Sequence, residues 1–79
     1  VGPNPQGVAV STTGATAGYV YVANGDAGTV SVINPAGVVV NTIDLSAFAY
    51  GVAVSPTGDN AGNVYITNFF NGTVSVISA

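Results

Sequence analysis

The amino-acid sequence predicts an all-β protein whose short strands are arranged in two tandem repeats. Three segments return 44 residues further along the chain, in the same order and at the same spacing. GVAVS at residues 7–11 returns at residues 51–55, VYVAN at residues 20–24 returns as VYITN, and GTVSVI at residues 28–33 returns unchanged. A repeat of about 40–50 residues built from short strands is typical of propeller blades or of a related β array.

The first repeat, residues 7–45, is expected to form four strands. Runs rich in β-branched and aromatic side chains favour strands, and they alternate with Gly, Asn, Asp and Pro, which favour turns. The expected strands are residues 7–11, 19–24, 29–34 and 38–45. No segment has the apolar spacing of an amphipathic helix. The strands are apolar on both sides; because a sheet with one wet face alternates apolar and polar residues, both faces are expected to be covered.

The second repeat, residues 51–79, is expected to be incomplete. It contains counterparts of the first three strands, and the sequence stops before a counterpart of the fourth. Residues 46–50 form the linker between the repeats, and the Pro- and Gly-rich residues 1–6 form an N-terminal connector. The predicted architecture is therefore a pair of antiparallel, β-propeller-like blades, one four-stranded and one three-stranded, completed by other chains.

The last strand of the second repeat is the predicted assembly edge. It has no charge and no proline, so it lacks two features that usually keep an edge strand from pairing with other chains. It also resembles the short, uncharged segments that form intermolecular sheets. The residues of this edge are Thr73, Val74, Ser75, Val76 and Ile77.

Charged side chains are almost absent. The 79 residues include only three, all aspartate, and there is no Lys, Arg, His or Cys. A chain without cationic side chains cannot neutralise phosphates, so no nucleic-acid partner is expected. Every apolar run is shorter than the roughly 18 residues of a membrane span, so membrane insertion is not expected. The sequence does not begin with Met, so we expect a processed product or a piece of a longer protein.

The repeated motifs resemble the YVTN-type β-propeller repeat. The resemblance rests on PQGVAVS at residues 5–11, YVYVAN at residues 19–24 and GTVSVI at residues 28–33, with their second copies. It implies a four-stranded antiparallel blade, often found in secreted or cell-surface proteins of bacteria and archaea, and no single activity. Family members carry several blades and more charged residues, and these departures count against a closed ring within one chain.

Few side chains could perform chemistry. Without His, Cys, Lys or Arg, the usual activated nucleophiles are excluded. Two carboxylates could act as acid and base, but Asp26 and Asp59 fall in different turns and Asp44 falls in a strand. Asp26 with Asn24, or Asp59 with Asn60, could begin a weak calcium site, although calcium usually takes six or more oxygen ligands. Turn capping is the favoured interpretation, and we predict no enzyme activity, no metal and no cofactor.

Four aromatic residues are candidates for contact with a partner or ligand. Phe69 and Phe70 replace the Gly–Asp pair that the first repeat has at the same turn. Aromatics at an exposed loop tip indicate contact with a subunit, a sugar or an apolar partner. The alternative, that the loop folds over the end of its own sheet, has equal weight. For Phe48 and Tyr50, in the linker, packing between the repeats is favoured over ligand contact.

Asn71 begins the one N-x-Thr sequence of the chain, so it is a candidate for N-glycosylation. An Asn–Gly pair is also what a tight hairpin turn prefers, because both residues tolerate positive φ. The turn interpretation is favoured, and the two can coexist.

Three functions agree with these features. The predicted one is a non-catalytic, extracellular or cell-surface structural subunit, which associates with copies of itself through strand edges and stacked blades into a filament or ring. The second is a small lectin-like module, formed by oligomerisation, that binds carbohydrate through Tyr, Phe and Asn; the loop aromatics are not repeated, which counts against it. The third is a piece of a larger propeller whose function lies elsewhere.

Overall fold

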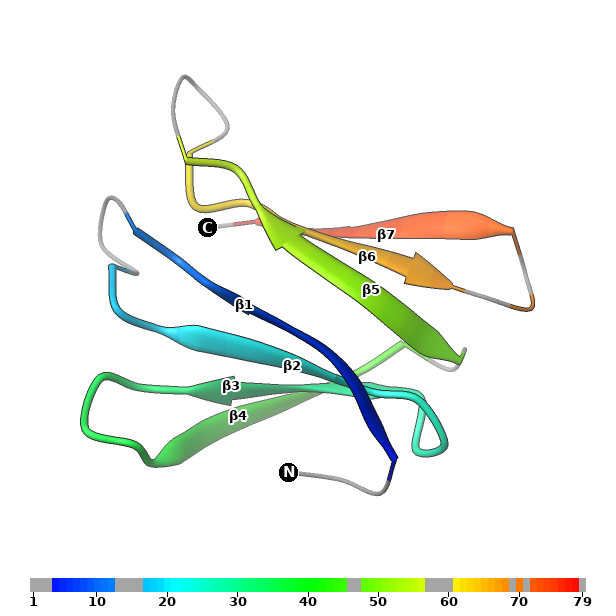
Figure 1. The fold of residues 1–79 in the computed structure, drawn as a ribbon, viewed down its shortest axis with the longest axis horizontal. Coiled ribbons are helices and arrows are strands. Elements are labelled where there is room, and N and C mark those ends of the chain that lie inside the picture. Colours follow the sequence, from blue (N-terminus) through cyan, green and yellow to red (C-terminus); the bar gives the residue numbers. More distant parts are fainter. Residues whose placement is uncertain are drawn as a thin grey trace.

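The protein consists of two antiparallel sheets. The structure is a computed structural model, and it describes residues 4–12, 17–45, 48–56, 61–68, 70 and 72–78. Within them there is no helix, and the first sheet has the order β1-β2-β3-β4 and the second β5-β6-β7 (Figure 1). The strands are β1 (Pro5–Val10), β2 (Val20–Asn24), β3 (Thr29–Ile33), β4 (Val39–Asp44), β5 (Ala49–Val54), β6 (Val64–Asn68) and β7 (Thr73–Ile77). The predicted all-β class, with four strands and then three, is confirmed.

The first strand of each sheet begins earlier than the sequence predicts. Pro5 pairs with Asn24, and the register shifts between Pro5 and Gly7. In the second sheet Ala49 pairs with Asn68, and the register shifts between Ala49 and Val52. A bulge lets a strand bend and continue its pairing. Each of these strands therefore extends back into residues that the sequence assigned to the connector and the linker.

The turns that follow β2 and β6 have the same backbone geometry. The N–H of Gly28 donates to the carbonyl oxygen of Asn24 at 3.0 Å, and the N–H of Gly72 donates to that of Asn68 at 3.0 Å. Both glycines have a φ of 66°, a conformation that a residue with a Cβ adopts only at a steric cost. The sequence repeat is thus a repeat of backbone conformation as well.

A buried asparagine side chain joins the second and third strands of each sheet. The Nδ2 of Asn24 donates to Thr29 Oγ1 at 3.2 Å and to Ser31 Oγ at 2.8 Å. Asn68 makes the same two bonds one repeat later, at 3.0 Å and 2.9 Å. The Oδ1 of Asn68 is buried without a hydrogen-bond partner. Each asparagine therefore fixes the side-chain pairing of two strands in an otherwise apolar sheet.

Each sheet has two faces, because alternate residues of a strand point to opposite sides. The strand registers group the residues of each face. We call one the tyrosine face: Tyr21, Ala23, Val30 and Val32 in the first sheet, and Tyr65, Thr67, Val74 and Val76 in the second. We call the other the valine face: Val8, Val10, Val20 and Val22 in the first sheet, and Val52, Val54, Val64 and Ile66 in the second.

The hydrophobic core lies between the tyrosine face of the first sheet and the valine face of the second. Tyr21, Ala23 and Val30 form one buried cluster with Val64 and Ile66. The contact joins unlike faces, so each sheet uses a different side for it. One face of each sheet is covered by the other sheet, and the remaining two faces do not meet each other.

The two sheets approach most closely at β1 and β5, which lie side by side and run in the same direction (Figure 1). A Cβ added to Gly7 would lie 2.7 Å from the carbonyl oxygen of Tyr50 and 3.5 Å from the Cα of Gly51. The first of these distances is too short for any side chain. Glycine at position 7 is therefore required by the approach of two backbones.

We predict that Gly7→Ala weakens the contact between the sheets. Overpacking of this kind typically costs about 1–3 kcal/mol, so the free energy of unfolding should fall by that amount in a urea titration. The matched control is Gly51→Ala, whose Cβ would meet only the hydroxyl of Thr67, at 3.0 Å. Equal losses for the two variants would show that the approach of β1 to β5 does not limit the fold.

We also predict that Asn24→Ala destabilises the protein more than Asn68→Ala does. The first change leaves the buried hydroxyl of Ser31 without its donor, and such a loss typically costs about 1–3 kcal/mol. The second removes an amide whose oxygen already lacks a partner. Thermal unfolding of both variants at low protein concentration compares them, and a larger loss for Asn68→Ala would contradict the assignment.

Candidate functional site

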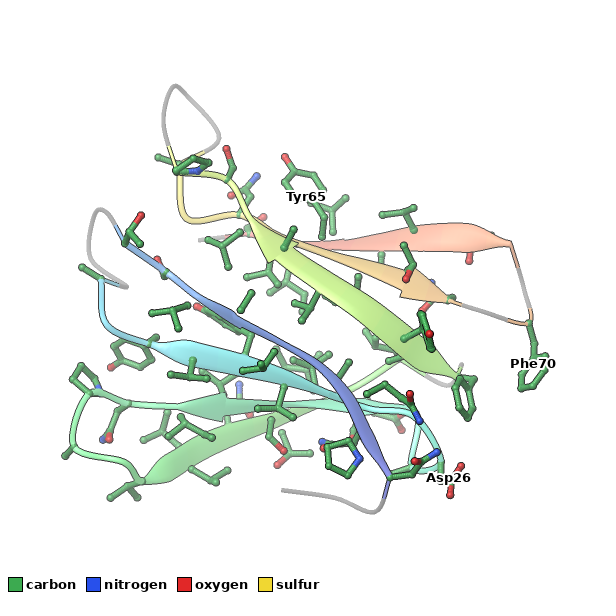
Figure 2. The ribbon with its side chains drawn as sticks, viewed as in Figure 1. Asp26, Tyr65 and Phe70 are labelled. Carbon is green, nitrogen blue, oxygen red and sulfur yellow. The ribbon has the colours of Figure 1, made fainter. Side chains whose placement is uncertain are left out.

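Two faces are not covered by the other sheet: the valine face of the first sheet and the tyrosine face of the second. We call them the open faces, and both carry exposed apolar side chains. On the valine face of the first sheet Val8 is 64% exposed and Val10 52%. On the tyrosine face of the second sheet Val74 and Val76 are 58% and 57% exposed, whereas their counterparts Val30 and Val32 are buried. Figure 2 shows Tyr65 on the side of the second sheet that faces away from the first. Grouped apolar exposure of this kind marks an interaction surface.

A shallow pocket lies at one end of the open valine face. Its volume is about 140 Å³, it opens to solvent, and it is lined by Pro5, Gln6, Gly7, Val8 and Val22. Sites for small molecules usually occupy about 300–1,000 Å³. The pocket is therefore of a size to receive one or two side chains rather than a cofactor.

The predicted assembly edge is strand β7 itself. Within the described residues β7 pairs with β6 and forms the margin of the three-stranded sheet. Ser75 and Ile77 are half-buried and Thr73 is exposed. Val74 and Val76 belong to the tyrosine face as well, so β7 offers both a backbone edge and part of an apolar face. Pairing through this edge stays a prediction.

The aromatic candidates that the structure describes differ in how far they are buried. Phe48 is half-buried, and a Cβ on Gly25 would lie 2.7 Å from the Cζ of its ring. This residue thus packs from the linker against a turn of the first sheet, as expected for packing between the repeats. Phe70, labelled in Figure 2, is 75% exposed. It meets Phe48 edge-on, with ring centroids 5.2 Å apart and an interplanar angle of 67°. Tyr50 is about half exposed.

Two of the predicted site residues, Phe69 and Asn71, lie outside the described residues, and so do Asp59 and Asn60. The partner, ligand and glycosylation predictions at Phe69 and Asn71 therefore stay predictions. Of the remaining aspartates, Asp26 is exposed and its Oδ1 accepts a hydrogen bond from the Nδ2 of Asn4 at 3.2 Å.

Metal-binding groups do not gather in the part of the chain that the structure describes. It holds no group of three or more His, Cys, Asp or Glu side chains that could bind a metal ion. The calcium interpretation paired Asp26 with Asn24, but the amide of Asn24 is buried and directed at Thr29 and Ser31. In the same described residues no helix is long and apolar enough to cross a membrane.

The sequence predicts that both faces of each sheet are covered, but it does not identify the residues that meet a partner. Val8, Val10 and Tyr65 are therefore not among the predicted site residues, because a run that is apolar on both sides does not tell which side a partner covers. The signal that could have found them is the 44-residue offset. This offset places each exposed residue of an open face at the same position in the repeat as a residue that lies in the core or packs against it.

No family model matches the chain, and a search of curated proteins found no match. Function must therefore be inferred from the internal repeat and from the geometry of the two sheets.

We predict that the two phenylalanine rings contribute unequally to stability. Phe70→Ala should lower the free energy of unfolding by about 1 kcal/mol or less, since an edge-to-face pair contributes about 0.5–1.5 kcal/mol and most of the side chain is exposed. Phe48→Ala should cost about 2 kcal/mol, because it also uncovers the turn at Gly25. Thermal unfolding measures both. A larger cost for Phe70→Ala would mean that the exposed ring holds the loop in place.

Proposed function

We propose that this chain is a non-catalytic, extracellular structural unit that associates with copies of itself. The observation that carries the proposal is the apolar character of both open sheet faces. Burying apolar surface stabilises an association by about 25 cal/mol per Å² before the entropic costs are counted. The faces carrying Val8 and Val74 are extended and expose apolar side chains, as an interaction surface does. The register places one charged residue, Asp44, on the first of them, in β4.

The near absence of charge supports the same proposal. Three aspartates are the only charged side chains of the chain. Soluble small domains usually devote about 25–35% of their surface to charged residues, which keep copies apart. Here the exposed large apolar side chains outnumber the charged ones: Val8, Val10, Val38, Val39, Val40, Tyr50, Phe70, Val74 and Val76.

The arrangement of the strands supports a propeller-like array, and with it the resemblance to the YVTN-type repeat. The sheets meet at their first strands, β1 and β5, while β4 and β7 lie at the outer margins (Figure 1). Blades arranged around an axis have this relation to one another. Successive sheets that pack through unlike faces can also be continued, since each added sheet presents the same open face again.

Carbohydrate binding is the second candidate, and the exposed ring of Phe70 beside Phe48 favours it. The apolar face of a sugar stacks on such rings. A sugar that binds only the folded protein raises its melting temperature, so thermal shift with a panel of sugars tests this candidate. Phe70→Ser should abolish any shift that depends on this ring.

The proposal predicts self-association that salt does not dissolve. The chain has no cationic side chain, so no ion pair of side chains can hold copies together, and screening by 1 M NaCl should not separate them. Ammonium sulfate should strengthen the association, because sulfate favours apolar burial. Sedimentation velocity over a range of protein concentrations measures both effects, and negative-stain electron microscopy distinguishes rings from filaments.

A protein that remains a monomer at every concentration would contradict the proposal. Dissociation by NaCl alone would also contradict it, because the contact would then depend on charge. A single, concentration-independent mass above that of the 7.7 kDa chain would favour a closed ring over a filament.

A further inference from the structure

The two open faces are repeat copies of the two faces that form the core. On the tyrosine face Tyr21, Val30 and Val32 of the first sheet return as Tyr65, Val74 and Val76 of the second. On the valine face Val8, Val10 and Val20 return as Val52, Val54 and Val64. The molecule therefore buries one tyrosine–valine pair of faces. In the second pair, which has nearly the same residues, Val8, Val10, Val74 and Val76 are exposed and Val22 is buried.

The two named positions that differ between these pairs offset each other in part, because one side chain becomes larger and the other smaller. Ala23 of the covered tyrosine face becomes Thr67 on the open one, which is larger. Ile66 of the covered valine face corresponds to Val22 on the open one, which is one methylene smaller. The hydroxyl of Thr67 already accepts the N–H of Gly51 at 2.8 Å. Because cores tolerate exchanges that conserve total volume, the open pair can pack as the covered pair does.

The pocket lies where this packing would occur. Its lining residues Pro5 and Val22 correspond by the 44-residue offset to Ala49 and Ile66. Both of these are completely buried in the core between the sheets. The part of the pocket that Pro5 and Val22 form is thus the counterpart of two positions that, on the second sheet, are covered in the core.

We infer that a second copy of this chain docks its open tyrosine face, with Tyr65, Val74 and Val76, onto the open valine face, with Val8 and Val10. The contact is head-to-tail: it joins unlike faces and repeats the packing inside each molecule. This inference rests on the proposed self-association and specifies which two faces meet; we call their contact the joint. Because the joint leaves one open face at each end of a pair, it grows into a filament or closes into a ring.

Two charge variants and their mixture test the joint. Val8→Lys places a charge on the valine face alone, and Val74→Lys places one on the tyrosine face alone; both positions are exposed in the single molecule. Each variant should be a monomer, with its dissociation constant raised at least tenfold, because the joint would bury an unpaired charge. The control is Val38→Lys in the β3–β4 turn, which is exposed but on neither face, and which should assemble as the parent chain does.

The mixture carries the decisive result. A chain with Val8→Lys keeps its open tyrosine face unchanged, and a chain with Val74→Lys keeps its open valine face unchanged. An equimolar mixture should therefore form a one-to-one dimer that cannot grow, because its two remaining faces both carry lysine and repel each other. Sedimentation velocity and native mass spectrometry measure it, and circular dichroism checks that each variant is folded.

Different results would overturn self-association and the contact between unlike faces. A parent chain that stays monomeric overturns self-association itself. A parent chain that assembles while Val8→Lys assembles equally well overturns the face-to-face joint and indicates pairing through the β7 edge. A mixture that stays monomeric also overturns the head-to-tail joint.

Discussion

The packing of one sheet's tyrosine face on the other sheet's valine face is the contact on which the structure depends. An antiparallel sheet of three or four strands needs a covered apolar face to be stable in water, and neither sheet here has a helix or loop layer of its own within the described residues. The contact requires β1 and β5 to come together, and Gly7 permits this because a side chain there would strike the backbone at Tyr50. Local features such as the buried asparagines then fix each sheet internally.

Much of the fold could be predicted from the sequence, because its signals are local. The runs of β-branched residues and the turn residues between them fix seven strands, and the Asn34–Val38 turn forms with Pro35 and Gly37 in the expected places. The early starts of β1 and β5 could not be predicted, because a bulge depends on pairing with a distant strand. Packing of Phe48 between the repeats is expected from the sequence, but its contact with Gly25 could not be predicted, because it joins residues that are distant in the chain.

The candidate site was harder to predict than the fold, for a physical reason. Alternation along a strand separates two faces but does not say which face of which sheet meets the other. Once the core identifies one such pair, the 44-residue offset assigns the other pair without further information. The exposed β7 edge and the open tyrosine face share Val74 and Val76, so assembly through either one involves the same residues. Val8 lies in β1, on the valine face of the first sheet. It therefore belongs to the contact between faces and not to the β7 edge.

Cross-linking through introduced thiols tests the joint of unlike faces most directly. The chain has no cysteine, so Val8→Cys and Val74→Cys each supply a single reactive group. With a short bifunctional thiol reagent, the account predicts that a mixture of the two variants yields cross-linked dimers containing one copy of each. Dimers formed mainly within Val74→Cys alone would contradict it, because they would place two β7 strands against each other.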